Sequence, residues 1–100
     1  MGTVTFSPAS LQDLIDIGDY IAKDNRANAR RFVDKLIEQC QRIEKSPLAY
    51  PRRENLVPGL RMASMGHYAI FFRVLGDVVR IERVLHGARD MTRLFELRKT

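Results

Sequence analysis

Residues 66–90, GHYAIFFRVLGDVVRIERVLHGARD, predict a two-stranded hairpin. Residues 68–75 are apolar with one interruption, residues 78–85 are largely β-branched and apolar, and Gly76-Asp77 between them is a two-residue turn signal. A loop of these two residues fixes the register, with Leu75 opposite Val78, Val74 opposite Val79, Phe72 opposite Ile81 and Ile70 opposite Arg83. One face of the hairpin is therefore nearly all apolar.

The other face of the hairpin carries two arginines in an unfavourable pairing. The register places Arg73 directly opposite Arg80, and like charges in that position destabilise a hairpin. A neighbouring carboxylate such as Glu82, or an anionic partner, would compensate for the repulsion. Both arginines are therefore candidates for a binding surface.

Arg83 differs from these two arginines, because the register places it on the apolar face. A lone charge there is costly, so we expect an ion-pair partner, for which Asp90 and Glu44 are within reach. A slip of the register by one residue would expose Arg83 instead. We expect a structural ion pair rather than a contact with a target.

The residues at the start of the chain predict a strand and a helix. Val4 and Phe6 alternate with threonines, which favours a short strand, and Ser7-Pro8 supplies an N-cap and a first helical residue. The apolar stripe expected for this helix is Leu11, Leu14, Ile15, Ile21 and Ala22, with Gly18 on the same stripe. Gly18 would let another backbone approach closely.

A second helix and an irregular connection follow. Asn25 can cap this helix, which is expected to end before Ser46-Pro47. Its predicted apolar face is Phe32, Val33, Leu36, Ile37, Cys40 and Ile43. Residues 46–59, SPLAYPRRENLVPG, contain three prolines and one glycine, which predicts an irregular connection over the surface.

The order of elements predicts an α+β fold in one domain that spans residues 1–100. A strand over residues 60–65 precedes the hairpin, and Asp90 could cap a short C-terminal helix over 91–97. We expect an N-terminal strand and a two-helix antiparallel hairpin packed on a mostly antiparallel sheet whose last three strands form a meander. The other sheet face, with the paired arginines, would stay uncovered and is the expected binding surface.

The composition fits a small protein that folds without crosslinks. One hundred residues bury roughly two thirds of the unfolded surface, and the single cysteine, Cys40, excludes an internal disulfide and is expected to be a buried thiol. One cysteine and two histidines offer no metal-ligand spacing, so neither a metal nor a cofactor is expected. We find neither a signal peptide nor a membrane-length apolar stretch, which predicts a cytoplasmic protein.

The net charge of +5 comes from the second half of the chain. Residues 1–50 hold seven basic and seven acidic side chains, whereas residues 51–100 hold ten basic and five acidic ones, and nine of those ten are arginines. Arginine favours planar, bidentate contact with carboxylates or phosphates. An acidic protein or a nucleic acid is therefore a reasonable partner, and a solvated basic surface with no target is the alternative.

Short segments along nearly the whole chain share the pattern of a known superfamily. They are Ser7-Pro8-Ala9, Tyr20-Ile21-Ala22, residues 47–51, Pro58-Gly59-Leu60-Arg61, residues 68–74 and residues 84–90. In these segments, and in length, charge and element order, the chain resembles the RelE/ParE toxins of bacterial type II toxin–antitoxin systems. The resemblance implies growth inhibition, plasmid stabilisation and neutralisation by an antitoxin.

Three positions bear on which branch of this superfamily the chain resembles. RelE-like members are ribosome-dependent mRNA endonucleases, which need cationic side chains and an acid–base group around the scissile phosphate. This chain has Ala69 where those nucleases carry an arginine and Phe95 where they carry a tyrosine, whereas Arg89 fits their remaining arginine. The two losses favour the ParE-like branch.

The ParE-like resemblance implies a non-enzymatic inhibitor of DNA gyrase that stabilises the cleaved-DNA state. It also implies a hetero-oligomer with a ParD-like antitoxin whose acidic tail folds on the toxin. A RelE-like endonuclease, in which other basic residues and His86 replace the missing groups, is the alternative, and a binding module without toxicity is a third possibility. Direct binding of nucleic acid is left open, and no membrane contact is expected.

Seven residues are candidates for contact with a target or antitoxin, and none is predicted to be catalytic. They are Tyr50, Arg61, Arg73, Arg80, His86, Arg89 and Arg93. Arg61 would join the paired arginines if its strand pairs alongside, and Tyr50 would support the same region. His86 could act as an acid or base oriented by Asp90, but without a second nucleophile we expect a structural or contact role.

Overall fold

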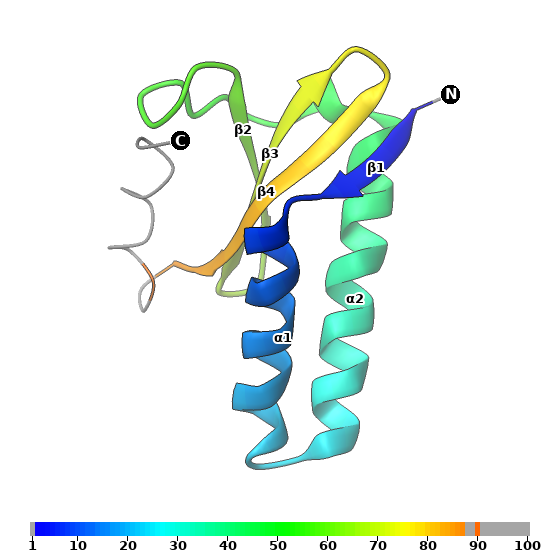
Figure 1. Cartoon of the computed structure of the whole chain (residues 1–100), viewed down its shortest axis with the longest axis vertical. Helices are drawn as coiled ribbons and strands as arrows, with labels where there is room; N and C mark the ends of the chain where they lie inside the picture. Colours follow the sequence, from blue (N-terminus) through cyan, green and yellow to red (C-terminus); the bar gives the residue numbers. More distant parts are fainter. Residues whose placement is uncertain (1, 88–89, 91–100) are drawn as a thin grey trace.

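The computed structural model describes residues 2–87 and 90 of the chain. The elements in order are β1 (Thr3–Phe6), α1 (Pro8–Ala22), α2 (Arg26–Lys45), the 3-10 helix η1 (Pro47–Ala49), β2 (Leu60–Met65), β3 (Tyr68–Leu75) and β4 (Val78–His86). The four strands form one sheet in the order β1-β4-β3-β2, with β1 parallel to β4 and the other neighbours antiparallel. Both helices lie on the same side of the sheet (Figure 1). The α+β prediction is confirmed, while the C-terminal helix expected over 91–97 lies outside the described residues.

Both helices begin at the caps that the sequence predicts. The Ser7 hydroxyl accepts a hydrogen bond from the backbone N–H of Ser10 at 3.0 Å, and the Asn25 side chain accepts one from Asn28 at 3.0 Å. Each cap satisfies one backbone donor that the first helical turn leaves without a partner. The second helix ends at Lys45, as expected.

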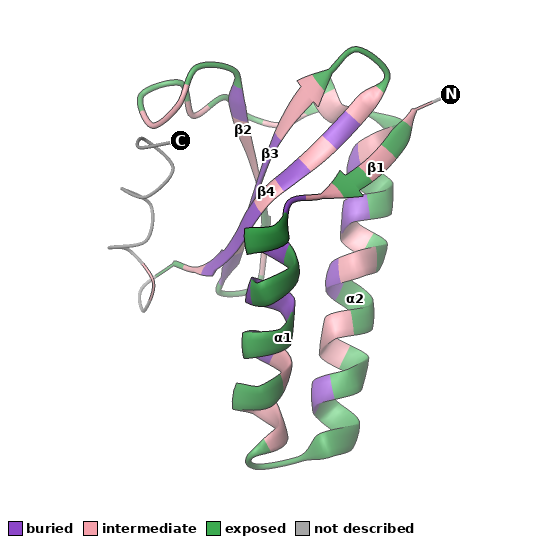
Figure 2. Ribbon diagram, viewed as in Figure 1, coloured by how far each residue is buried: buried purple, intermediate pink, exposed green. Residues whose placement is uncertain are grey.

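The buried side of α1 differs from the predicted apolar stripe. Leu11 and Ile15 are 49% and 56% exposed, and the residues that α1 buries are Ser10, Asp13, Leu14 and Ile17. Figure 2 shows α1 exposed along the side that faces away from the sheet. The prediction was wrong because the polar residues Ser10 and Asp13 form hydrogen bonds on the buried side, which hydrophobic periodicity alone does not reveal.

Gly18 is not a point of close backbone approach, contrary to the prediction. A Cβ atom at this position would lie 3.4 Å from Cγ2 of Val33 on α2 and would meet nothing closer. The two helices therefore approach each other here through a valine side chain, and the glycine is not needed to avoid a clash.

The hairpin has the predicted register only in its first half. Gly76 adopts the positive φ of 62° that favours glycine in the turn, and the pairs from Leu75 with Val78 to Phe72 with Ile81 are present. Between Phe71 and Phe72 the register shifts, so that Phe71 pairs with Arg83 and Ile70 with Val84. The predicted pairing of Ile70 with Arg83 was wrong, because a β-bulge leaves Glu82 without a partner residue on β3.

The two faces of the sheet carry hydrophobic clusters of different size. The larger cluster lies between the sheet and the helices and includes Leu36, Cys40, Ile43, Ile70, Phe72 and Ile81. The smaller one contains Leu60, Phe71 and Leu85, with Leu56 and Val57 of the loop before β2 packed against it. The face away from the helices is therefore partly covered by the loop, rather than bare as expected.

Cys40 is the buried thiol that the sequence predicts. It is fully buried on α2, and burial raises the pKa of its thiol to about 12. A thiol in this environment stays protonated at neutral pH and is a packing residue.

Candidate functional site

Arg73 and Arg80 share one carboxylate on the face away from the helices. Nε and Nη2 of Arg73 lie 2.5 Å from Oε2 of Glu82, and Nε of Arg80 donates to Oε1 at 3.1 Å. The side chain of Glu82 is 11% exposed, whereas those of Arg73 and Arg80 are 38% and 39% exposed. The compensation that the sequence predicts is confirmed, and the cluster keeps one net positive charge on a solvent-facing surface.

Arg83 has a buried partner on α1 that the sequence reasoning missed. Its Nε and Nη2 donate to the two carboxylate oxygens of Asp13 at 2.8 and 2.9 Å, and the backbone N–H of Val84 donates to the same carboxylate at 2.9 Å. The predicted ion-pair role is confirmed, but the suggested partners, Asp90 and Glu44, were wrong. No local signal in the sequence pointed to Asp13, because it lies 70 positions from Arg83 and outside the predicted apolar stripe of α1.

Arg61 and Tyr50 belong to the opposite face of the sheet. Arg61 pairs with Phe72 across the strands, and its Nη1 donates to the Tyr50 carbonyl at 2.8 Å and the Leu48 carbonyl at 3.5 Å. The Tyr50 ring contacts Phe72 edge-on, with ring centroids 5.8 Å apart. Arg61 therefore holds the connection after α2 and does not join Arg73, contrary to the prediction.

His86 ends β4 beside a second aromatic group. It pairs with Tyr68, whose ring it contacts edge-on at 5.2 Å, and its ring stacks on His67 at 5.9 Å. The backbone N–H of His86 donates to the Asp90 carboxylate at 2.9 Å. This last bond fixes the backbone at the start of the C-terminal segment.

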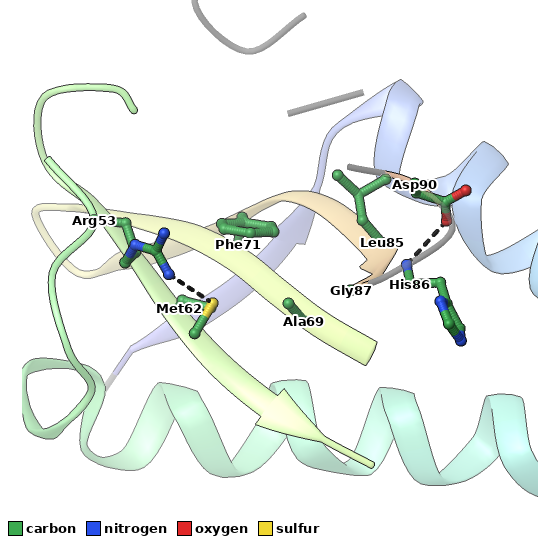
Figure 3. Close-up of a pocket in the computed structure, with 8 residues that line it drawn as sticks. All are labelled: Arg53, Met62, Ala69, Phe71, Leu85, His86, Gly87 and Asp90. Carbon is green, nitrogen blue, oxygen red and sulfur yellow. Dashed lines mark hydrogen bonds between the residues drawn. The ribbon is translucent and has the colours of Figure 1, made fainter. Parts of the chain in front are cut away.

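A pocket of about 210 Å³ lies on the face away from the helices, near the end of β4. Its lining includes Arg53, Met62, Ala69, Phe71, Leu85 and Asp90. Phe71 and Leu85 lie on one side of the hairpin, while the His86 ring points away from them (Figure 3). One guanidinium nitrogen of Arg53 lies 3.6 Å from the sulfur of Met62. The pocket therefore has a positive charge beside its apolar lining residues. The sequence pattern does not indicate this pocket, because Arg53 comes from the irregular loop.

The predicted site residues are thus distributed over two faces. Arg73 and Arg80 lie together on the face away from the helices, whereas Arg61, Tyr50 and the His86 ring lie on the side of Phe72 and Tyr68. His86 lies six positions after Arg80 along the strand, which is about 20 Å at about 3.3 Å per residue. Arg89 and Arg93 lie outside the described residues. Among residues 2–87 and 90, the candidate arginines and His86 do not come together in one site.

The described part of the chain has neither a metal-binding cluster nor a membrane-spanning helix. Among those residues no group of three or more histidine, cysteine or acidic side chains is placed to hold a metal ion. The helices α1 and α2 are also too short or too polar to cross a membrane.

Comparisons with known proteins give a match to a family model and matches to solved structures. A family model described as "ParE toxin of type II toxin-antitoxin system, parDE" matches residues 4–91. A solved structure described as "Chromosomal ParDE TA system from P. aeruginosa" matches with a TM-score of 0.75 and 24% identity over 86% of this chain and 96% of that chain. The structural likeness at this identity shows the fold alone. No curated protein matches the chain.

Proposed function

Because the chain belongs to the ParE toxin family of type II toxin–antitoxin systems, we propose that it inhibits bacterial growth as a non-enzymatic inhibitor of DNA gyrase. It acts in the cytoplasm by stabilising the state of gyrase in which the DNA is cleaved. The residues that engage gyrase are His86, Arg89 and Arg93, at the end of β4 and in the segment beyond it. The family assignment supports gyrase as the target. The separation of the candidate residues on two faces of the sheet supports a non-enzymatic mechanism.

The division of the candidate residues between two faces carries the argument against an enzyme. An endonuclease needs its cations and its acid–base group around one scissile phosphate. Arg61 and the His86 ring lie on the helix side of the sheet, while Arg73 lies on the other side and is held by Glu82. In a RelE-like endonuclease, the guanidinium of Arg73 would therefore have to reach the opposite face of the sheet.

The antitoxin is proposed to bind the face away from the helices. Arg73 and Arg80 offer an acidic segment two half-exposed guanidinium groups, and the pocket over Phe71 and Leu85 offers room for an apolar side chain. A ParD-like antitoxin with an acidic tail that folds on binding fits this combination. The complex is a hetero-oligomer.

The first experiment measures gyrase directly. The purified toxin is expected to lower supercoiling by gyrase and to raise the amount of cleavage complex, and the Arg89→Ala and His86→Ala variants are expected to lose both effects and toxicity. Arg30→Ala, an exposed arginine at the far end of α2, is the matched control and should keep them. Unchanged supercoiling and cleavage with the wild-type protein would contradict the proposal.

A second experiment tests the endonuclease alternative. Primer extension on translated mRNA should show no toxin-dependent cuts. Codon-specific cuts that vanish in the Arg89→Ala variant would instead establish RNA cleavage. Expression that causes no growth arrest in the absence of antitoxin would point to a binding module without toxicity.

The antitoxin proposal has its own test. A gene for a small acidic protein next to the toxin gene identifies the partner, and its affinity for Arg73→Gln/Arg80→Gln is expected to fall at least about tenfold, about 1.4 kcal/mol. Arg26→Gln/Arg30→Gln removes the same charge from exposed positions on α2 and should bind normally. Equal losses for the two double variants would show a general charge effect and would contradict docking on the sheet.

A further inference from the structure

A row of cations follows one side of α2 and is not used by the contacts described above. Arg31, Lys35 and Arg42 are spaced by four and seven residues and are all exposed. At about 100° per residue, they lie within about 40° of one another around the helix. They extend over about 16 Å at about 1.5 Å per residue.

Four arginines of the sheet already form ion pairs or hydrogen bonds within the fold. Arg73 and Arg80 share Glu82, Arg83 is paired with Asp13, and Arg61 donates to carbonyls. In the part of the chain that the structure describes, no carboxylate forms an ion pair with Arg31, Lys35 or Arg42. The charge of this row is therefore available to a partner.

Polar side chains surround the row. Arg31 donates a hydrogen bond to the Asn28 side chain, which lies three residues before it, and Gln39 lies between Lys35 and Arg42. The carboxylates of α2 are Asp34, Glu38 and Glu44. Asp34 and Glu44 fall at other positions around the helix, whereas Glu38 lies about 20° from Arg31, three residues after Lys35 and four before Arg42. The row together with Glu38 therefore carries two net positive charges. Figure 2 shows exposed residues along the side of α2 away from α1.

This chemistry points to a phosphate backbone rather than to an acidic protein. Protein interfaces bury an apolar centre and deplete it of lysine, whereas contacts to a nucleic-acid backbone are made by lysine, arginine, asparagine and glutamine. Helix α2 carries six basic and three acidic side chains, and cations that follow one helix are typical of nucleic-acid-binding domains. We propose that Arg31, Lys35 and Arg42 of α2 bind the phosphate backbone of duplex DNA without reading its sequence.

A straight helix fits a rigid duplex. Over about 16 Å of axis, one strand of B-DNA presents about five phosphates at about 3.4 Å each, so three cations find partners along one strand. The site lies on the outside of the helical hairpin, so bound DNA leaves the face with Arg73 and Arg80 free. Binding of DNA by this row does not require gyrase, because the purified protein alone would bind the duplex.

The test is the salt dependence of binding to a fluorescent 20-base-pair duplex, measured by anisotropy with the full chain. Binding without sequence preference is expected at 50 mM NaCl, and the slope of log K against log [salt] should fall in magnitude by about 2.7 in Arg31→Ala/Lys35→Ala/Arg42→Ala, because each phosphate contact contributes about 0.9. Circular dichroism melts show whether this triple variant remains folded.

The matched control is Lys23→Ala/Arg26→Ala/Arg30→Ala. It removes the same net charge from exposed positions outside the row, and it should keep the wild-type slope within about one unit. Absence of duplex binding at 50 mM NaCl, or equal loss of slope in the two triple variants, would overturn the proposal. Tighter binding of a single-stranded RNA of the same length would also overturn it, in favour of an RNA site.

Discussion

The arginines of the sheet occur in two different environments, on either side of the bulge at Glu82. Arg83 is 8% exposed and is paired with the Asp13 carboxylate of α1, which also accepts a backbone N–H. Arg73 and Arg80, on the face away from the helices, are half-exposed and share the carboxylate of Glu82. Arg80 and Arg83 lie on the same strand, three residues apart, and the bulge at Glu82 lies between them.

The comparison distinguishes structural arginines from those available for binding. A buried ion pair that loses one partner leaves an uncompensated charge in the interior, which is strongly destabilising. A surface cluster loses little when a partner is removed, because water and salt replace the interaction. Arginine content alone therefore does not distinguish the two kinds, whereas the exposure of the arginine side chain does, at 9% for Arg83 against 38% and 39% for Arg73 and Arg80.

The largest effect is expected at the buried pair. Asp13→Ala leaves Arg83 and the Val84 N–H without the carboxylate and should lower the free energy of unfolding by about 3–5 kcal/mol. Urea denaturation measures it. Asp19→Ala, an exposed carboxylate on the same helix, is the control and should change stability by less than about 0.5 kcal/mol. A loss below about 1 kcal/mol for Asp13→Ala would remove the distinction between the buried pair and the half-exposed cluster.

A smaller effect is expected at high pH on the helix-covered side. Because burial raises the pKa of Cys40 to about 12, the unfolded chain releases this proton first as the pH rises above about 9. Stability is unaffected below the unfolded pKa and falls between that value and the folded one, by about 1.4 kcal/mol at pH 10. The Cys40→Ala variant should lack this part of the pH dependence when each protein is referred to its own stability at pH 7. Identical pH profiles would show that the thiol is accessible.

The exposed cluster should respond more weakly and depend on salt. Glu82→Gln removes the charge between Arg73 and Arg80, so their repulsion should lower stability by about 1 kcal/mol in 20 mM NaCl and by less in 1 M NaCl. Glu38→Gln on the exposed side of α2 is the control for a loss of one negative charge. A salt-independent loss as large as that of Asp13→Ala would show that the second cluster is also structural.

The smallest effect concerns the contact between the helices. The Cβ atom of Gly18→Ala would lie 3.4 Å from Val33, at the inner limit of ordinary contact. Alanine favours the helix over glycine by about 1 kcal/mol, so stability should rise by up to about that amount. A loss of stability in thermal melts would show that the helices require the glycine after all.

Local signals placed most elements of the fold correctly. The caps at Ser7 and Asn25, the turn at Gly76-Asp77 and the strand over residues 60–65 all depend on interactions within a few residues. The sequence also carried the likeness to the RelE/ParE superfamily, which the family match over residues 4–91 bears out. The site residues themselves could be predicted only in part, because spacing places a residue on a strand without specifying which groups lie across from it.

The sequence by itself therefore determined the elements, their order and the family, whereas the tertiary structure decided which side of each element is used. Strand β1 ends at Phe6, and the Val84 N–H beyond it finds the carboxylate of Asp13 instead of another strand. That contact helps to bury the polar side of α1 and leaves Leu11 and Ile15 exposed. The partner of Arg83 depends on residues about 70 positions apart in the chain, and so no local pattern could predict it.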